Sequence, residues 1–281
     1  MTTSAAAAQD GRSRRVPRTG VLLALAARDY KLAKSYRVAF ALDLVLGIVS
    51  LAIFFFISRS LGDPSPASLG SAPTYFAFAA VGIAVTVVME SAANGLASRL
   101  REEQMTGTLE ALVAQPLTVP ELAFGLTAYS FVFATLRAGL YVLAAGFLLD
   151  LDLGKTNWPA FVLMLLVTGI ALTAIGIFLG GVVLLVKRAR ALPGLVTLVL
   201  GLLGGAYFPI SALPEPLETL AQVVPTRFAF DGLRAAVFGG GGWVTDLLAL
   251  SAFSAIALPL AVCALAFALK LSRSRGSLAQ F

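Results

Sequence analysis

Residues 159–186 read PAFVLMLLVTGIALTAIGIFLGGVVLLV, a run of 28 residues without one charged side chain. A helix needs about 20 mostly apolar residues to cross roughly 30 Å of hydrocarbon, so this run is long enough to span a bilayer. Five further segments meet the same test, near residues 38–58, 74–97, 121–149, 191–208 and 245–270. The pattern predicts an all-α integral membrane protein with six transmembrane helices, of which the fifth is the shortest.

The composition of the 281-residue chain agrees with a membrane location. It is 58% hydrophobic and 13% charged, with a mean hydropathy of +0.89, whereas soluble domains carry about 25% charged residues. A soluble helical protein would need polar helix faces, which these segments lack. We expect one six-span domain over residues 20–275, between a disordered tail at 1–19 and a short tail at 276–281. The single cysteine, Cys263, excludes an intrachain disulfide.

Positive charges set the expected orientation. If the N-terminus is inside, the cytoplasmic pieces contain sixteen Lys and Arg residues and the external loops contain four. Cytoplasmic loops of membrane proteins are rich in these residues. The sequence therefore predicts a multi-pass protein of the cell inner (plasma) membrane with both termini cytoplasmic. Residues 20–37, which are apolar and then basic, suit a helix lying at the cytoplasmic surface.

A polar insert at residues 98–120 separates the second and third spans. Its centre contains the acidic residues Glu102, Glu103 and Glu110 and the turn Thr106-Gly107-Thr108, and Leu109 stands at the expected helix start. Leu109, Leu112 and Val113 make one apolar helix face that ends before Pro116. Such a helix can enter a groove in a partner protein or rest on lipid headgroups. Because acidic side chains are unfavourable at an anionic inner leaflet, the pattern favours a partner.

The loop from Pro209 to Trp243 is apolar although it is rich in proline. Its periodicity predicts two short helices, each too short to cross a bilayer, so we expect a re-entrant hairpin that dips into the outer leaflet. Its marker residues are Pro209, Pro214, Pro225 and Arg234, with Thr226 as the expected cap of the second helix and Phe230, Leu233 and Val237 on that helix's buried face. A plain extracellular loop is the alternative.

Catalytic chemistry is not indicated anywhere in the chain. Histidine is absent, which excludes Ser-His triads and His-based zinc or haem sites. The sequence also lacks the G-x-x-x-x-G-K-[ST] motif, so a P-loop of its own cannot bind ATP. We therefore expect no catalytic residue, no metal and no cofactor on this chain. Any ATP that drives transport must bind to another polypeptide.

Three ionisable residues lie within the predicted spans: Asp43, Glu90 and Arg137. Such residues are costly in a bilayer and prompt a functional hypothesis. Counted from the cytoplasmic ends, Asp43 and Glu90 share one level at about 8–12 Å, while Arg137 lies about 25 Å deep. Arg137 is thus expected to meet neither acid unless its helix is tilted or has a long interfacial lead-in. The three residues either line a translocation path, or they pair neighbouring helices and extend their charged groups toward the membrane surface.

Aromatic residues cluster toward the outer half of the spans. They either line a substrate path or form an interfacial belt. The candidate substrate-pathway residues are Asp43, Phe55, Glu90, Arg137, Tyr207 and Phe208. Glycines spaced by four, at Gly176 with Gly180 and at Gly201 with Gly205, allow close helix approach. The second pair, with Gly204 inside it, gives mild support for a subunit contact along the fifth span.

Two motifs together resemble a known family. They are Glu102-Glu103-x-x-x-Gly107-Thr108-Leu109-Glu110-x-Leu112-x-x-x-Pro116 in the insert, and Gly205-x-Tyr207-Phe208-Pro209, Leu213-Pro214, Pro225-Thr226 and Asp231-Gly232-Leu233-Arg234 near the hairpin. Both resemble type-2 ATP-binding cassette (ABC) transporter permeases, most strongly the daunorubicin-resistance-like drug exporter branch. The likeness covers essentially residues 20–275, and the two motifs stand in the family's order.

The resemblance implies a permease that exports a hydrophobic small molecule, such as a drug or antibiotic, or a lipid-like substrate. It implies a second copy or a similar permease as dimer partner, with the first and fifth spans at the seam. It also implies a cytoplasmic ABC ATPase subunit that holds MgATP and moves a coupling helix at Gly107–Glu110. The complex would then be an ATP-hydrolysing translocase. The alternatives are a lipid-linked glycan exporter of the same family, or an ion-coupled carrier using Asp43, Glu90 and Arg137.

Overall fold

Helices are the regular elements of the computed structural model, which describes residues 37–61, 69–107, 118–186 and 191–274. In chain order they are α2 (Arg37–Leu61), α3 (Tyr75–Met105), α5 (Val119–Leu148), α6 (Trp158–Leu185), α7 (Leu192–Gly204), the 3-10 turn η3 (Ile210–Ala212), α8 (Glu215–Ala221), α9 (Pro225–Phe238) and α10 (Trp243–Ser274). The all-α prediction is confirmed. The surface helix predicted at residues 20–37 lies outside the described residues, except for Arg37, which begins α2.

Five helices are long and apolar enough to cross a bilayer: α2, α3, α5, α6 and α10. The fifth predicted span, residues 191–208, forms only the 13-residue helix α7, which is about 20 Å long. The reason is Gly205, whose φ of 80° ends the helix in a conformation that glycine adopts without a steric penalty. The described chain therefore shows five long candidate spans and one shorter apolar helix.

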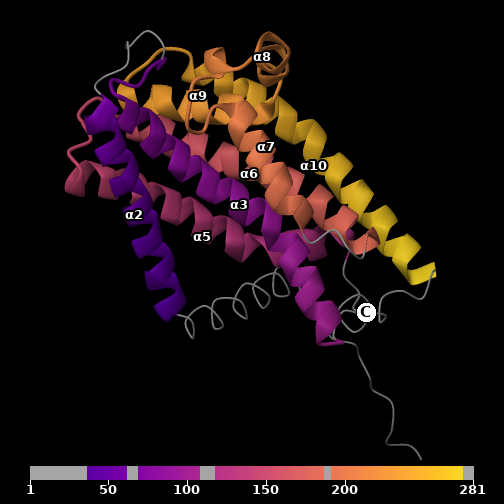
Figure 1. Ribbon diagram of the computed structural model, residues 1–281. Helices are drawn as coiled ribbons and strands as arrows, with labels where there is room; N and C mark the ends of the chain where they lie inside the picture. The colour runs from indigo at the N-terminus through magenta and orange to yellow at the C-terminus, as the bar shows by residue number, and fades with distance from the viewer. Residues whose placement is uncertain (1–36, 62–68, 108–117, 187–190, 275–281) are drawn as a thin grey trace, which may run out of the picture.

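The centre of the bundle is formed by α3 and α6. Burial reaches 78% of the most apolar stretch of α3 and 61% in α6, but only 11% in α2. Figure 1 shows α2 standing at one edge of the bundle and α10 at the other. Most of α2 therefore presents its apolar side chains to whatever surrounds the chain.

The glycines of α6 allow α3 and α6 to pack closely. Gly176 lies against the backbone carbonyl of Ala92, and a Cβ added at Gly180 would meet the Leu96 side chain at 2.8 Å. The close approach predicted from the spacing of these two glycines is confirmed.

The glycines of α7 face the interior of the same chain. A Cβ at Gly204 would lie 2.5 Å from the Thr226 hydroxyl of α9, and one at Gly201 would lie 3.3 Å from Met89 of α3. The expectation that these glycines serve a subunit contact is therefore wrong, because spacing alone does not show which neighbour a small face meets. The opposite face of α7 exposes Leu195 and Leu198.

The polar insert begins as a continuation of α3. This helix has 31 residues and runs on to Met105, about 46 Å in all. It continues because neither glycine nor proline occurs between Gly95 and Gly107, and because an Arg99–Glu102 ion pair of 3.4 Å supports its last turns. Gly107, with φ of 71°, ends this segment. Thr108, Leu109 and Glu110, which were predicted to lie in a separate coupling helix, are outside the described residues.

The predicted hairpin is built from η3, α8 and α9, at the end of the bundle opposite to the free end of α3 (Figure 1). Prolines stand at the helix starts: Pro209 precedes η3, Pro214 precedes α8 and Pro225 is the first residue of α9. Helix α8 has only seven residues. Thr226 is not the cap of α9, since it lies inside the first turn and its hydroxyl donates to the Leu200 carbonyl of α7 at 2.8 Å.

Candidate functional site

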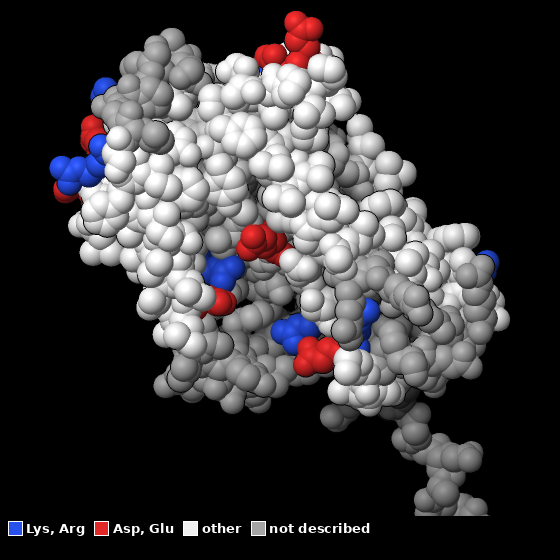
Figure 2. Space-filling view, in the orientation of Figure 1, with Lys and Arg blue, Asp and Glu red and all other residues white. Residues whose placement is uncertain are grey.

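A cavity of about 300 Å³ lies between α2, α3 and α5. Its lining combines charged, hydroxyl, aromatic and aliphatic side chains: Asp43, Leu46, Gly47, Ser50, Phe54, Ile83, Thr86, Val87, Glu90, Arg137, Tyr141 and Tyr207. Figure 2 shows acidic and basic side chains together in a hollow near the middle of this face. The volume is at the lower end of the range of small-molecule sites.

Each helix contributes one face to the cavity. On α2 the lining residues recur at 43, 47, 50 and 54, and on α3 they recur at 83, 86, 87 and 90. These spacings of three and four residues are those of one side of an α-helix. Arg137 and Tyr141 do the same on α5. The cavity is therefore built on regular helices, which hold their side chains in fixed relative positions.

An ion pair connects α5 to α2 across the cavity. The Arg137 guanidinium lies 3.2 Å from a carboxylate oxygen of Asp43. The Arg137 side chain is 15% exposed and that of Asp43 is 58% exposed. Residue counting allowed Arg137 to reach an acid only if its helix is tilted, and this condition holds. Figure 1 shows α2 and α5 strongly inclined to each other, so residues of different nominal depth meet.

Tyr141 makes a second connection between the same two helices. Its hydroxyl donates a hydrogen bond of 2.9 Å to the backbone carbonyl of Asp43. Its ring fills the space beside Gly47, where any side chain would collide with it. Tyr141 is 2% exposed, so a glycine on α2 and a buried tyrosine on α5 fix where α2 stands.

Glu90 of α3 faces the same cavity from the other side. Its side chain is exposed to the hollow, and no other described residue gives its carboxylate a hydrogen bond or an ion pair. Among the ionisable side chains that line the cavity, Glu90 is thus the one whose charge is not directly paired.

One end of the cavity is aromatic. Phe54 and Tyr207 stack with ring centroids 5.4 Å apart and both line the cavity. Phe55 and Phe208, which were predicted pathway residues, do not line it. Phe55 instead turns to α3, where its ring packs edge-to-face with that of Phe76 at a centroid distance of 5.3 Å, because adjacent residues of a helix point about 100° apart.

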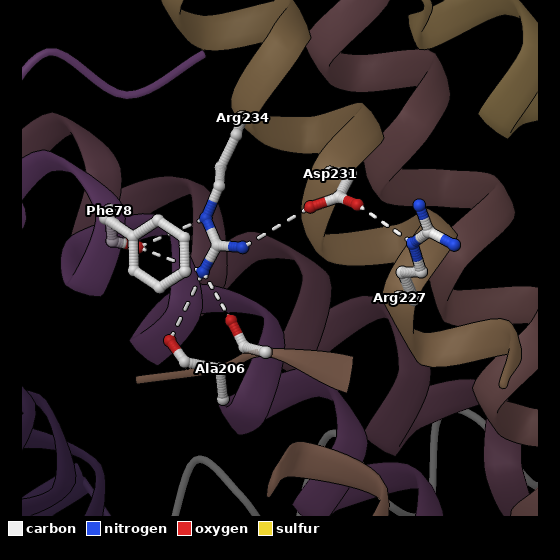
Figure 3. Close-up of polar contacts among 6 residues, drawn as sticks. Phe78, Ala206, Arg227, Asp231 and Arg234 are labelled. Carbon is white, nitrogen blue, oxygen red and sulfur yellow. Dashed lines mark hydrogen bonds and ion pairs between the residues drawn. The ribbon is translucent and has the colours of Figure 1, made fainter. Parts of the chain in front are cut away.

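Arg234 anchors the hairpin to the helices beneath it. It is 2% exposed, and it donates to the carbonyl of Phe78 on α3 (3.2 Å) and to those of Gly205 (2.8 Å) and Ala206 (3.3 Å) after α7. Its guanidinium also lies 3.4 Å from the centroid of the Phe78 ring, as Figure 3 shows. One side chain therefore joins α9, α3 and the end of α7.

The charge of Arg234 is balanced from its own helix. Asp231 lies 3.6 Å away and also pairs with Arg227 at 3.4 Å (Figure 3). Burial lowers the pKa of Arg234 to about 9, and Asp231 opposes that shift. The guanidinium thus remains charged near neutral pH. Within the sequence Asp231-Gly-Leu-Arg234, the aspartate balances the charge of the arginine that links α9 to α3 and to the end of α7. Periodicity alone could not reveal this role.

Comparison with known sequences decides the family. The sequence profile of the ABC-2 type transporter family matches residues 21–238, which include the cavity and the whole hairpin. The chain belongs to the ABC-2 type transporter family. Membership means a membrane setting, implies a partner ATP-binding cassette subunit, and requires no cofactor on the permease itself.

Two curated relatives are distant in sequence. The permease is 24% identical over 181 residues to the linearmycin resistance permease protein LnrN of Bacillus subtilis (strain 168), covering 63% of this chain and 46% of that protein. It is 25% identical over 194 residues to nodulation protein J of Sinorhizobium fredii (strain NBRC 101917 / NGR234), covering 67% of this chain and 72% of that protein. The match therefore spans less than half the length of the first relative.

The cavity of this permease contains residues that the sequence did not single out. Tyr141, Thr86 and Ser50 line it beside Asp43 and the other predicted residues. The signal that could have found Thr86 and Ser50 is their helical spacing from Glu90 and Asp43. Tyr141 lies one turn beyond Arg137, so it too shares a face with a charged residue.

Proposed function

We propose that this chain is the permease subunit of an ABC exporter that moves a hydrophobic small molecule or a lipid-like substrate out of the cytoplasm or the inner leaflet. The substrate passes along the cavity between α2, α3 and α5. A separate ATPase subunit binds MgATP and drives the movement through the cytoplasmic insert. Both chain termini are cytoplasmic, in the cell inner (plasma) membrane.

The exposed charges of the cavity carry this proposal. Asp43 is 58% exposed in a helix that otherwise presents Leu42, Val45 and Leu46 outward. A carboxylate that faces lipid within a span is unfavourable, by up to about 2.5–3.5 kcal/mol at the helix centre on insertion scales. A second permease, identical or similar, that covers this face removes the cost and encloses a polar path between the two subunits.

The arrangement of the two ends of the bundle supports transport in one direction that is driven by an ATPase. Glu102 and Glu103 extend from the bundle on the last turns of α3, at the end opposite to the hairpin (Figure 1). An ATPase bound there would push on α3, whose other residues line the cavity at Thr86 and Glu90. Motion at the cytoplasmic end is therefore transmitted along one continuous helix to the path.

The packing of the hairpin supports the proposal that the external end of the substrate path is closed. Helix α9 is packed against α3, α6, α7 and α10, and its buried face includes Phe230, Leu233 and Val237 as predicted. Arg234 ties it to α3, so that a shift of α3 also pulls on the hairpin. We propose that the hairpin caps the outward path and opens when α3 moves.

The meeting of Asp43, Glu90 and Arg137 in one cavity favours a second candidate, an ion-coupled carrier. Charged residues at membrane depth also mark proton and ion pathways. This candidate requires no ATPase and predicts transport that follows a proton gradient or the membrane potential.

Affinity purification of the chain from its native membrane in mild detergent tests the proposal. We expect two permease copies and two ATPase subunits by native mass spectrometry, with magnesium-dependent ATP hydrolysis that vanadate inhibits. A permease that purifies intact without an ATPase would contradict the proposal and favour the ion-coupled carrier.

A further inference from the structure

The cavity between α2, α3 and α5 has an excess of negative charge. Asp43, Glu90 and Arg137 are its charged lining residues. Arg137 already pairs with Asp43 at 3.2 Å, and the described chain offers the Glu90 carboxylate no hydrogen-bonding or ion-pairing partner. An unpaired charge within a membrane is costly, so a positive charge from outside the described chain would stabilise this site.

A second copy of the chain would not supply that charge. It would bring the same three side chains to the shared face, and with them another unpaired carboxylate. Symmetric assembly therefore doubles the imbalance, which favours a ligand as the source of a positive charge that the cavity itself can accommodate.

The aromatic end of the cavity indicates what accompanies the positive charge. Phe54 and Tyr207 stack beside the cavity, about 16 Å along α2 from Asp43. Leu46, Ile83 and Val87 line the length between the two ends. A cationic group near Glu90 would thus continue into an apolar body that contacts aromatic faces, which themselves attract cations.

We propose that this cavity binds lipophilic organic cations, and that Glu90 is the residue that selects their positive charge. The proposal rests on the proposed function in taking the cavity as the substrate path, and it names the substrate class. Asp43 and Arg137 neutralise each other and hold α2 to α5, while Glu90 stays available to the ligand.

Two ions of matched shape and opposite charge test the selection. The full-length permease, in nanodiscs of uncharged phosphatidylcholine, is dialysed to equilibrium against tetraphenylphosphonium or tetraphenylborate, and binding to empty nanodiscs is subtracted. We expect saturable binding of the phosphonium and none of the borate. Glu90→Gln should weaken phosphonium binding about ten- to a hundredfold, as for loss of one charge-assisted contact.

Two variants control for folding and for general charge effects. Glu90→Asp keeps the carboxylate and should keep the preference for the phosphonium. Glu215→Gln removes an exposed carboxylate of α8 outside the cavity and should bind as the unmodified chain does. Equal affinity for both ions, no saturable phosphonium binding, or unchanged binding by Glu90→Gln would each overturn the cation site.

This measurement needs no ATPase, so it separates the two proposals. Absent phosphonium binding in a chain that co-purifies with an ATPase would remove the cation site and leave the exporter. Binding through Glu90 in a chain that has no ATPase partner would keep the cation site and remove ATP-driven export.

Discussion

Replacing Arg234 with lysine should loosen the hairpin from the bundle. Arg234 donates to three backbone carbonyls from two other segments and stacks on Phe78. Lysine presents a single compact ammonium that cannot make this fork and stack at once. Loss of one charge-assisted hydrogen bond, at about 1.5–3 kcal/mol, together with the contact on the Phe78 ring, at about 0.5–1 kcal/mol, gives an expected destabilisation of about 2–4 kcal/mol.

The assay is thermal unfolding of the purified permease in detergent, followed by fluorescence-detected size-exclusion chromatography. At about 2–4 °C per kcal/mol for a chain of this size, Arg234→Lys should lower the Tm by roughly 5–15 °C. Arg227→Lys is the matched control, because Arg227 is 31% exposed and pairs with the same Asp231; an exposed pair contributes about 1 kcal/mol or less. Equal Tm values for the two variants would refute the anchoring role.

The remaining predictions concern packing and coupling. Gly82→Ala should lower the free energy of unfolding by about 1–3 kcal/mol, because the new methyl group meets the Ala206 backbone carbonyl. Gly139→Ala, where the added methyl group enters open space, should instead stabilise α5 by up to about 1 kcal/mol. A higher Tm for Gly82→Ala than for Gly139→Ala would contradict this packing. Glu102→Lys combined with Glu103→Lys should leave membrane insertion unchanged and lower the Tm by only a few degrees, because the Arg99–Glu102 pair is exposed. The double variant should abolish transport and substrate-stimulated ATP hydrolysis; unchanged export would contradict the coupling role.

The sequence predicted the helices well because their signal is local. Long apolar runs gave the positions of α2, α3, α5, α6 and α10 to within a few residues, apart from the eight-residue extension of α3 to Met105. The span expected at residues 191–208 was too long, since hydropathy does not register that Gly205 leaves the helical conformation. Prolines correctly marked the starts of α8 and α9.

The site was only partly predictable because its contacts depend on helix inclination. Asp43, Glu90 and Arg137 stood out as charges in apolar segments, but counting residues from each helix end brings Arg137 to the acids only if its helix is tilted, and the count does not give that tilt. The Tyr141 ring packs against Gly47, which lies 94 positions earlier in the sequence, and a single sequence gives no signal for such a pair. The apolar runs of the sequence show which segments form helices, but tertiary packing determines which helix faces contact one another.

Inside-out vesicles from the native host test the central claim, ATP-energised export, most directly. The measurement is uptake of radiolabelled tetraphenylphosphonium in the presence of a protonophore, compared with vesicles that lack the chain. ATP-driven permease transport predicts uptake that requires ATP and this chain, is inhibited by vanadate and persists with the protonophore. Chain-dependent uptake without ATP that the protonophore abolishes would contradict the account and establish an ion-coupled carrier.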